Sequence, residues 1–236
     1  MTDSKDVSMS NGQVVHFPIG TVGVDKTGAV ITSTVAKNLY GLGYRFALRS
    51  IGIAGSDPTS TGQSGQLTSG ELTNICSAGL AVSVFQLNFK QTVFSSETGT
   101  NDATYLVDRV QAMGFPVNAG FTLWFDLEYM GGTESTLLAY VNAWGQTVVK
   151  GGYAAGMYTG AGSPLSGTDI SNLADFHAYW QAGQRLTYAM PARGYQMYQL
   201  YPASQSIGGT LVDVDVVQHD FDGDAPPFWL ASSTAT

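Results

Sequence analysis

Short apolar runs alternate with amphipathic stretches along most of the chain, which is the pattern of successive strand and helix units. The runs predict strands at residues 20–26, 44–52, 81–89, 121–129, 154–159, 176–182, 195–201 and 212–218. Helices are predicted at about 32–42, after a cap at Thr68, at about 101–113, at about 135–149 and, shorter, after Thr168. Eight strands without a proline-rich linker or a change in composition favour one closed β/α barrel over two domains.

The last third of the chain departs from this regular alternation. Only about ten to twelve residues link the last three predicted strands, which is too short for a parallel crossover with its own helix and loops. Gly208 and Gly209 supply positive φ for a hairpin, so the last strand is expected to run antiparallel to the strand before it. We therefore predict an α/β fold: a single irregular TIM-type barrel of eight strands and about five helices.

Three segments are expected on this basis. Residues 1–17 form a polar N-terminal segment, residues 18–221 form the barrel, and residues 222–236 form a C-terminal tail. The acidic stretch 220–224 is interpreted as a solvated terminus rather than a calcium-binding loop.

Composition excludes several classes of partner. The chain of 236 residues carries 10 basic and 18 acidic side chains, a net charge of -8, and only 12% charged residues against about 25% in an average domain. So few basic residues, spread along the chain, argue against nucleic acid and anionic membranes as partners. No apolar run approaches the ~18 residues of a membrane span, and the polar opening does not resemble a signal peptide. Synthesis in the cytoplasm without a signal peptide is the resulting expectation.

With so few charges, acidic side chains inside apolar runs are informative. Five of them interrupt predicted strands, namely Asp25, Asp126, Glu128, Asp213 and Asp215. Side chains alternate along a strand, so Asp126 and Glu128 point to the same face. The first and last strands of a closed barrel are neighbours, and active sites lie where the parallel strands end. The five carboxylates are therefore expected to converge on one rim.

A cluster of like charges is costly, and three interpretations of it remain open. The acids could bind a metal, but no histidine shows ligand spacing, so no metal or other cofactor is predicted. They could be structural, exposed on the rim or paired with Arg45, Arg49 or Lys26. Or they could perform glycoside chemistry, which needs one carboxylic acid to protonate the leaving oxygen and one carboxylate to stabilise or attack the sugar.

Aromatic and amide side chains on the predicted strands are consistent with sugar binding, although a core role is an open alternative for each. Aromatic faces at strand ends can stack on sugar rings, and amides can bind hydroxyls. Tyr198, Tyr201 and Gln181 share this pattern. The candidate substrate-binding residues are Asp215, Trp124, Tyr129, Tyr158, Trp180, Gln86, Gln199 and Arg49.

Three motifs in this order resemble those of glycoside hydrolase family 25, the bacterial and phage muramidases. They are GVD at 23–25, FDLE at 125–128 and VDVD at 212–215. The stretches YGLGYRFALRS, LTSGELTNICSAGLAVSVFQ and GTNDATYLVDRVQAMGFP are similar to a related bacterial family described as glycoside-hydrolase-like. Together the resemblance covers about residues 22–218.

The resemblance implies a barrel without full helical crossovers between its last strands and cleavage of the β-1,4 bond between N-acetylmuramic acid and N-acetylglucosamine in peptidoglycan. It implies that Glu128 is the general acid and that Asp126 orients substrate or stabilises positive charge. Asp25 and Asp213 would complete the acidic rim. The muramidases typically have VDxN where this chain has VDVD, so Asp215 replaces an amide and leaves the role of that strand open.

The leading hypothesis is thus a peptidoglycan-degrading glycoside hydrolase of the lysozyme type. A non-catalytic glycan- or cell-wall-binding barrel, or a structural or cargo component of a phage or injection system, is the alternative. An enzyme of this kind would reach the cell wall by lysis or through a phage or secretion-system delivery apparatus.

Overall fold

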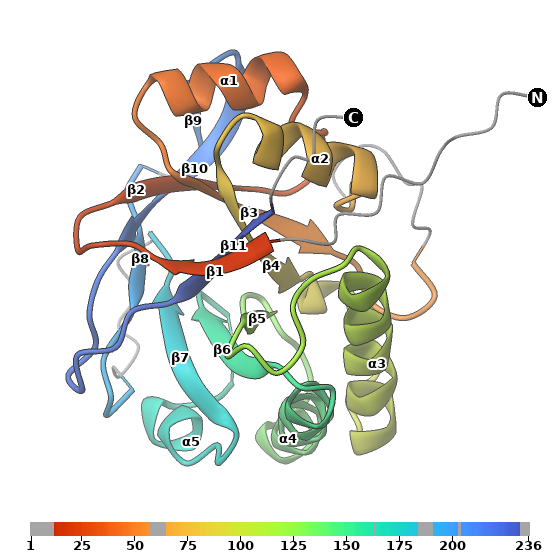
Figure 1. Cartoon of the computed structure of the whole chain (residues 1–236). Coiled ribbons are helices and arrows are strands. Elements are labelled where there is room, and N and C mark those ends of the chain that lie inside the picture. The colour runs from red at the N-terminus through yellow and green to blue at the C-terminus, as the bar shows by residue number, and fades with distance from the viewer. Residues whose placement is uncertain (1–11, 57–64, 163, 184–190, 203, 232–236) are drawn as a thin grey trace, which may run out of the picture.

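The computed structural model describes residues 12–56, 65–162, 164–183, 191–202 and 204–231. Eight strands close into the expected barrel (Figure 1). They are β2 (Val22–Lys26), β3 (Phe46–Ile51), β4 (Ala81–Gln86), β5 (Thr122–Asp126), β6 (Ala154–Thr159), β7 (Phe176–Gln181), β8 (Met197–Gln199) and β10 (Thr210–Val217). The first seven are parallel to their neighbours, and β10 closes the barrel antiparallel to both β8 and β2.

The five predicted helices surround this barrel (Figure 1). They are α1 (Ser33–Gly41), α2 (Ser69–Ser77), α3 (Ser96–Ala112), α4 (Glu134–Lys150) and α5 (Gly167–Ser171), and a short 3-10 helix, η1 (Asn88–Lys90), precedes α3. Thr68 caps α2 as predicted. Helix α3 begins earlier than predicted, because Ser95 and Thr98 form a capping box that satisfies its first N–H groups.

The irregular last third is confirmed in its main features. Strands β9 (Gln205–Ile207) and β10 form a hairpin whose turn is Gly208 and Gly209, at φ 62° and 91°. Such positive φ values favour glycine and match the twist of a two-residue hairpin. The described residues between β7 and β10 contain no helix, so the chain reverses and brings Asp213 to the rim at which the parallel strands end.

Strands also form near both ends of the chain, where the sequence analysis placed only a polar segment and a tail. Strand β1 (Gly12–His16) pairs antiparallel with β11 (Pro227–Ala231), and β11 contacts β4 through Trp229. Phe228 is fully buried, and its ring centroid lies 4.2 Å from that of Phe46 at the start of β3. The β1–β11 ribbon therefore covers the end of the barrel opposite the acidic rim (Figure 1), and the tail prediction is wrong for 227–231.

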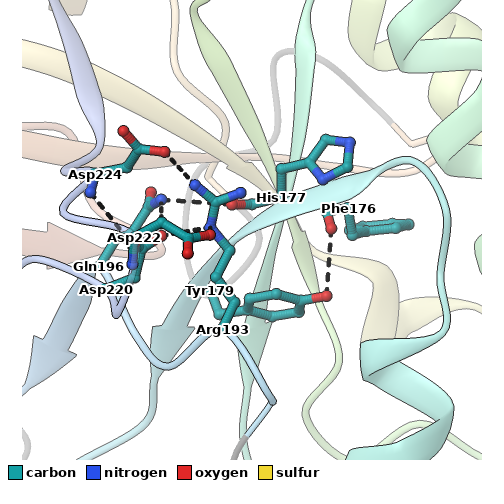
Figure 2. Close-up of polar contacts among 8 residues, drawn as sticks. All are labelled: Phe176, His177, Tyr179, Arg193, Gln196, Asp220, Asp222 and Asp224. Atoms are coloured by element: carbon teal, nitrogen blue, oxygen red, sulfur yellow. Dashed lines mark hydrogen bonds and ion pairs between the residues drawn. The ribbon is translucent and has the colours of Figure 1, made fainter.

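The acidic stretch 220–224 is likewise not a solvated terminus. Figure 2 shows Asp220 beneath Arg193, whose Nε donates to Asp220 Oδ2 at 2.5 Å. Gln196 Nε2 donates to the same oxygen at 2.8 Å, and the backbone N–H groups of Asp222 and Asp224 donate to Oδ1 at 3.0 and 2.9 Å. Asp220 is buried, so this turn is attached to the barrel wall by a saturated carboxylate.

Candidate active site at the carboxyl rim of the barrel

The structure brings the five predicted acids together. The antiparallel register of β2 and β10 places Asp25 directly opposite Asp213 and places Asp215 opposite Gly23, so all three share the inner face. Asp126 is the last residue of β5, and Glu128 follows two residues later. Charges on Asp213 and Glu128 both raise the pKa of Asp25, which reflects their proximity. We call these five residues the rim carboxyls.

Gln199 on β8 connects two of the rim carboxyls. Its Nε2 donates to Asp25 Oδ2 at 2.7 Å and to Asp213 Oδ2 at 3.3 Å. Its Oε1 accepts from the Tyr158 hydroxyl at 3.0 Å and from Gly183 N at 3.1 Å. With every polar atom bonded, the amide holds Asp25 and Asp213 in one orientation. Gln199 and Tyr158 were predicted at the site, and the structure places both there as supports of the carboxyls.

Asp126 organises the turn that carries Glu128. Its Oδ1 accepts the backbone N–H of Glu128 at 3.0 Å, and its own N–H donates to Asn88 Oδ1 at 3.2 Å. The half-buried Glu128 side chain lies over Gly160, where an added Cβ would lie 2.7 Å from Oε1. A backbone hydrogen bond from Ala161 also reaches Glu128. Asn88 and Gly160 were not predicted, because their roles depend on contacts between strands.

Burial raises the pKa of four rim carboxyls. Desolvation, reinforced by the charge of Asp213, raises the pKa of Asp25 to about 7. Desolvation also raises the pKa of Asp126 and of Asp215 well above the ordinary value and raises that of the half-buried Glu128. A carboxyl group that keeps its proton to higher pH than usual is suited to act as a general acid.

No described cation forms an ion pair with a rim carboxyl, although the charge of Lys26 interacts with Asp25 and Asp213. The ion pairs among the described residues join Arg49 to Glu71 and Arg193 to the 220–224 turn, and neither reaches a rim carboxyl. Lys26 Nζ donates to the Leu211 carbonyl, and Arg45 donates to the carbonyls of Tyr40 and Tyr44. Pairing of the acids with Arg45, Arg49 or Lys26 is therefore wrong. In the described part of the chain, no group of three or more His, Cys, Asp and Glu side chains is arranged to hold a metal ion.

Two predicted substrate-binding residues face away from the rim. Arg49 points outward from β3 and is buried against α2, where it donates to Glu71 at 2.6 and 3.2 Å. Gln86 points outward from β4, where its Nε2 donates to the carbonyls of Gly52 and Asp102 and its Oε1 accepts from Trp144 at 2.6 Å. Both belong to polar contacts between barrel and helices, so the predicted direct role in substrate binding is wrong for them.

The predicted aromatic platform is divided between core and rim. Trp124 and Trp180 are at most 1% exposed inside the barrel and lie edge to face at 6.1 Å, so neither can stack on a sugar. Tyr158 is also buried, and its hydroxyl donates to Gln199. Tyr129 is 59% exposed directly after Glu128, and Tyr201, just beyond β8, is 73% exposed. Only these two tyrosines are accessible for stacking among these five aromatic residues.

The closed β/α barrel gathers its carboxyl groups where the parallel strands end, which is where glycoside hydrolases of this fold class hold their catalytic acids. The chain belongs to the Rv2525c-like, glycoside hydrolase-like domain family, whose sequence profile matches residues 37–219. This membership confirms the resemblance drawn from the motifs. No curated protein sequence matches the chain significantly. Among the described residues, no helix has the length and apolar character needed to cross a membrane.

Solved structures share the fold at low sequence identity. An uncharacterized B. stearothermophilus protein is 20% identical, with a TM-score of 0.63 over 84% of this chain and 96% of that one. The Mycobacterium tuberculosis Tat-secreted protein Rv2525c, solved in complex with L-tartrate, is 15% identical, with a TM-score of 0.61 over 85% and 96%. The modular autolysin LytC from Streptococcus pneumoniae is 14% identical, with a TM-score of 0.61 over 84% and 47%.

Proposed function

We propose that this protein is a glycoside hydrolase that cleaves β-1,4 bonds of peptidoglycan in the manner of a muramidase. The observation that carries the proposal is Glu128: a half-buried carboxyl at the rim, with a raised pKa and four further carboxyls around it. Membership of a glycoside hydrolase-like family supports the reaction class. The fold shared with the autolysin LytC supports a cell-wall glycan as the substrate.

In this proposal each rim residue has a separate task. Glu128, which is half-buried and whose pKa is raised by burial, transfers its proton to the glycosidic oxygen as the bond to the anomeric carbon breaks. Asp25 and Asp213, held by Gln199, face the positive charge that develops on the sugar ring. Asp126 keeps Glu128 in place through the backbone hydrogen bond rather than by contact with the sugar.

Two exposed tyrosines supply the proposed sugar contacts. Tyr129 follows β5 and Tyr201 follows β8, two strands that β6 and β7 separate in the barrel order, and both side chains are exposed. Aromatic faces at such positions bind pyranose rings by stacking and leave the hydroxyls free for hydrogen bonds. Because the surface carries few basic residues, recognition of the wall is expected to depend on these contacts and not on charge.

The direct test is release of new reducing ends from purified peptidoglycan, with mass spectrometry of the products. Glu128→Gln keeps the size of the side chain and removes the proton donor, so activity should fall by about 10²-fold or more. Glu134→Gln, an exposed residue in the first turn of α4, is the matched control and should behave as the wild type. Fragments ending in muramic acid from the wild type and the control, but not from Glu128→Gln, are the expected result.

Absence of release from walls of several chemotypes would contradict the proposal. If the folded protein then still sedimented with those walls, the non-catalytic glycan-binding barrel would be the better interpretation. Arrival at the wall by lysis or through a delivery apparatus stays a prediction in either case.

A further inference from the structure

Asp215 occupies an unusual place among the rim carboxyls, because it is completely buried. It was predicted to contact substrate, but a residue without exposed surface cannot do so. It lies on the inner face of β10, and its carboxyl interacts with that of Asp25 on the neighbouring strand β2. The groups that face it from neighbouring elements are Asp25 on β2, Tyr158 on β6, Trp180 on β7, Gln199 on β8 and, on its own strand, Asp213.

One carboxyl oxygen of the Asp25–Asp215 pair lacks a hydrogen-bond donor among the described residues. Trp180 Nε1 donates to Asp215 Oδ1 at 3.0 Å, and Gln199 Nε2 donates to Asp25 Oδ2 at 2.7 Å. Asp215 Oδ2 is buried and receives no N–H or O–H from another described residue. Two ionised carboxylates cannot hydrogen-bond to each other, since both are acceptors. None of the ion pairs among the described residues includes Asp25 or Asp215, and Lys26, whose charge interacts with Asp25 and Asp213, donates its hydrogen bond to the Leu211 carbonyl instead. If one of the two carboxyls is protonated, it can donate a hydrogen bond to the other.

We propose that Asp215 is a positioning residue that keeps the last proton of the Asp25–Asp215 pair and donates it to Asp25, so that Asp25 loses its proton first and is held in place as a carboxylate. Burial favours the protonated form of a carboxyl, and Asp215, which is fully buried, is less accessible than Asp25, which is 6% exposed. The hydrogen bond from Asp215 lowers the pKa of Asp25 against the effects of burial and of Asp213, while burial raises that of Asp215 well above its usual range.

The assignment explains why a carboxyl can replace the amide of the VDxN motif. A protonated carboxyl has one donor and one acceptor oxygen, as a side-chain amide does, so it can accept from Trp180 and donate to Asp25 at the same time. It follows that Asp215→Asn should reproduce the bonded state, whereas Asp215→Leu, of similar size, should remove the donor to Asp25 and the acceptor for Trp180.

The first experiment needs no activity. Carbon-13 NMR of the aspartate carboxyls, assigned with Asp25→Asn and Asp215→Asn, should show that the Asp215 carboxyl is still protonated at the pH where Asp25 has ionised. In Asp215→Leu the titration of Asp25 should move to higher pH, and in Asp215→Asn it should stay within about half a pH unit of the wild type or below it. An ionised Asp215 at pH 7, or the same Asp25 titration in the Leu and Asn variants, would overturn the assignment.

A stability measurement with a matched control tests the same point. Asp102 is also buried, but its oxygens accept from Ala54 N, Gln91 Nε2 and the Tyr140 hydroxyl, so an amide there would oppose these donors. At pH 7, Asp102→Asn should lower the melting temperature by several degrees, whereas Asp215→Asn should stay within about 2 °C of the wild type. An equal loss in both variants would contradict a protonated Asp215.

The final arm rests on the proposed function. If the wild type cleaves peptidoglycan, the acid limb of kcat/KM should move to higher pH in Asp215→Leu and be restored toward the wild type in Asp215→Asn, which a merely structural role would not produce. Unchanged acid limbs in an active Asp215→Leu enzyme would overturn the positioning role. If the wild type is inactive, the proposed function fails, and the NMR and stability results still decide the protonation of Asp215.

Discussion

At the scale of single residues, Asp25 occupies surroundings that oppose its charge. Its pKa is raised from 3.8 to about 7 by burial and by Asp213. A group whose pKa is higher in the folded than in the unfolded state stabilises the fold fully at pH values below its unfolded pKa. This stabilisation is lost as the pH rises toward the folded pKa, here between about pH 4 and pH 7. At pH 8, Asp25→Asn should therefore have a higher free energy of unfolding than the wild type, by up to about 4 kcal/mol, and a higher melting temperature. At pH 4 the two proteins should differ little.

Calorimetry of both proteins across this pH range measures the effect. Glu97→Gln, an exposed change in α3, serves as the control and should leave the pH dependence as it is. A variant Asp25→Asn that is less stable than the wild type at pH 8 would mean that the ionised carboxylate is stabilised by contacts outweighing its desolvation.

Gly160 determines where the Glu128 carboxyl can lie. A Cβ at this position would lie 2.6 Å from Glu128 Cγ, closer than side chains tolerate, so Gly160→Ala must displace the proposed acid. We expect kcat/KM on peptidoglycan to fall about 10- to 100-fold, because small misplacements of a catalytic group are costly. Gly70→Ala in α2, where an added Cβ meets nothing within 4 Å, is the matched control. Full activity in Gly160→Ala would exclude Glu128, in its present position, as the acid.

At the scale of elements, the 220–224 turn is attached to the barrel by one buried carboxylate. Burial raises the pKa of Asp220, but hydrogen bonds from Arg193 and Gln196 outweigh it and leave that pKa below the ordinary 3.8. Asp220 therefore stabilises the fold above about pH 4, and this contribution is lost as pH falls further. Arg193→Ala should cost about 2 kcal/mol at pH 7, because it leaves the buried carboxylate uncompensated, and distinctly less at pH 3.

Urea denaturation at the two pH values measures the difference. Lys37→Ala, at an exposed position of α1, is the control for loss of a surface cation and should cost less than about 0.5 kcal/mol. An equal cost of Arg193→Ala at both pH values would mean that its aliphatic packing, not the ion pair, anchors the turn.

At the scale of the whole molecule, the β1–β11 ribbon joins the two ends of the described chain across the barrel. Phe228 on β11 is fully buried there, and its ring centroid lies 4.2 Å from that of Phe46 and 5.4 Å from that of Phe17. Phe228→Ala should lower the free energy of unfolding by about 3–5 kcal/mol. Phe221, which is 74% exposed, is the matched control, and its change to Ala should cost little. Equal midpoints of the two variants in urea would show that the ribbon adds little to the barrel.

Prediction from sequence succeeded where the determining interactions are local. The helix cap at Thr68, the hairpin glycines 208 and 209 and the positions of acids at strand ends were all evident, because each depends on neighbouring residues or on period-two alternation. The short run 227–231 was not recognised as a strand, because its pairing partner lies more than two hundred residues away in the chain.

The sequence by itself determined the kind of barrel, the antiparallel course of its last strand and the group of carboxyls at its rim, since periodicity and turn chemistry act over a few residues. Only the tertiary structure decided which side chains contact these carboxyls and which point away from them. Arg49 and Gln86 bond outward to the helices, Trp180 turns inward, and Asp215 interacts with Asp25, because strand register and helix packing select the partner of each polar group. A pKa is likewise a property of the assembled barrel, since burial, which no residue carries alone, produces most of the shift.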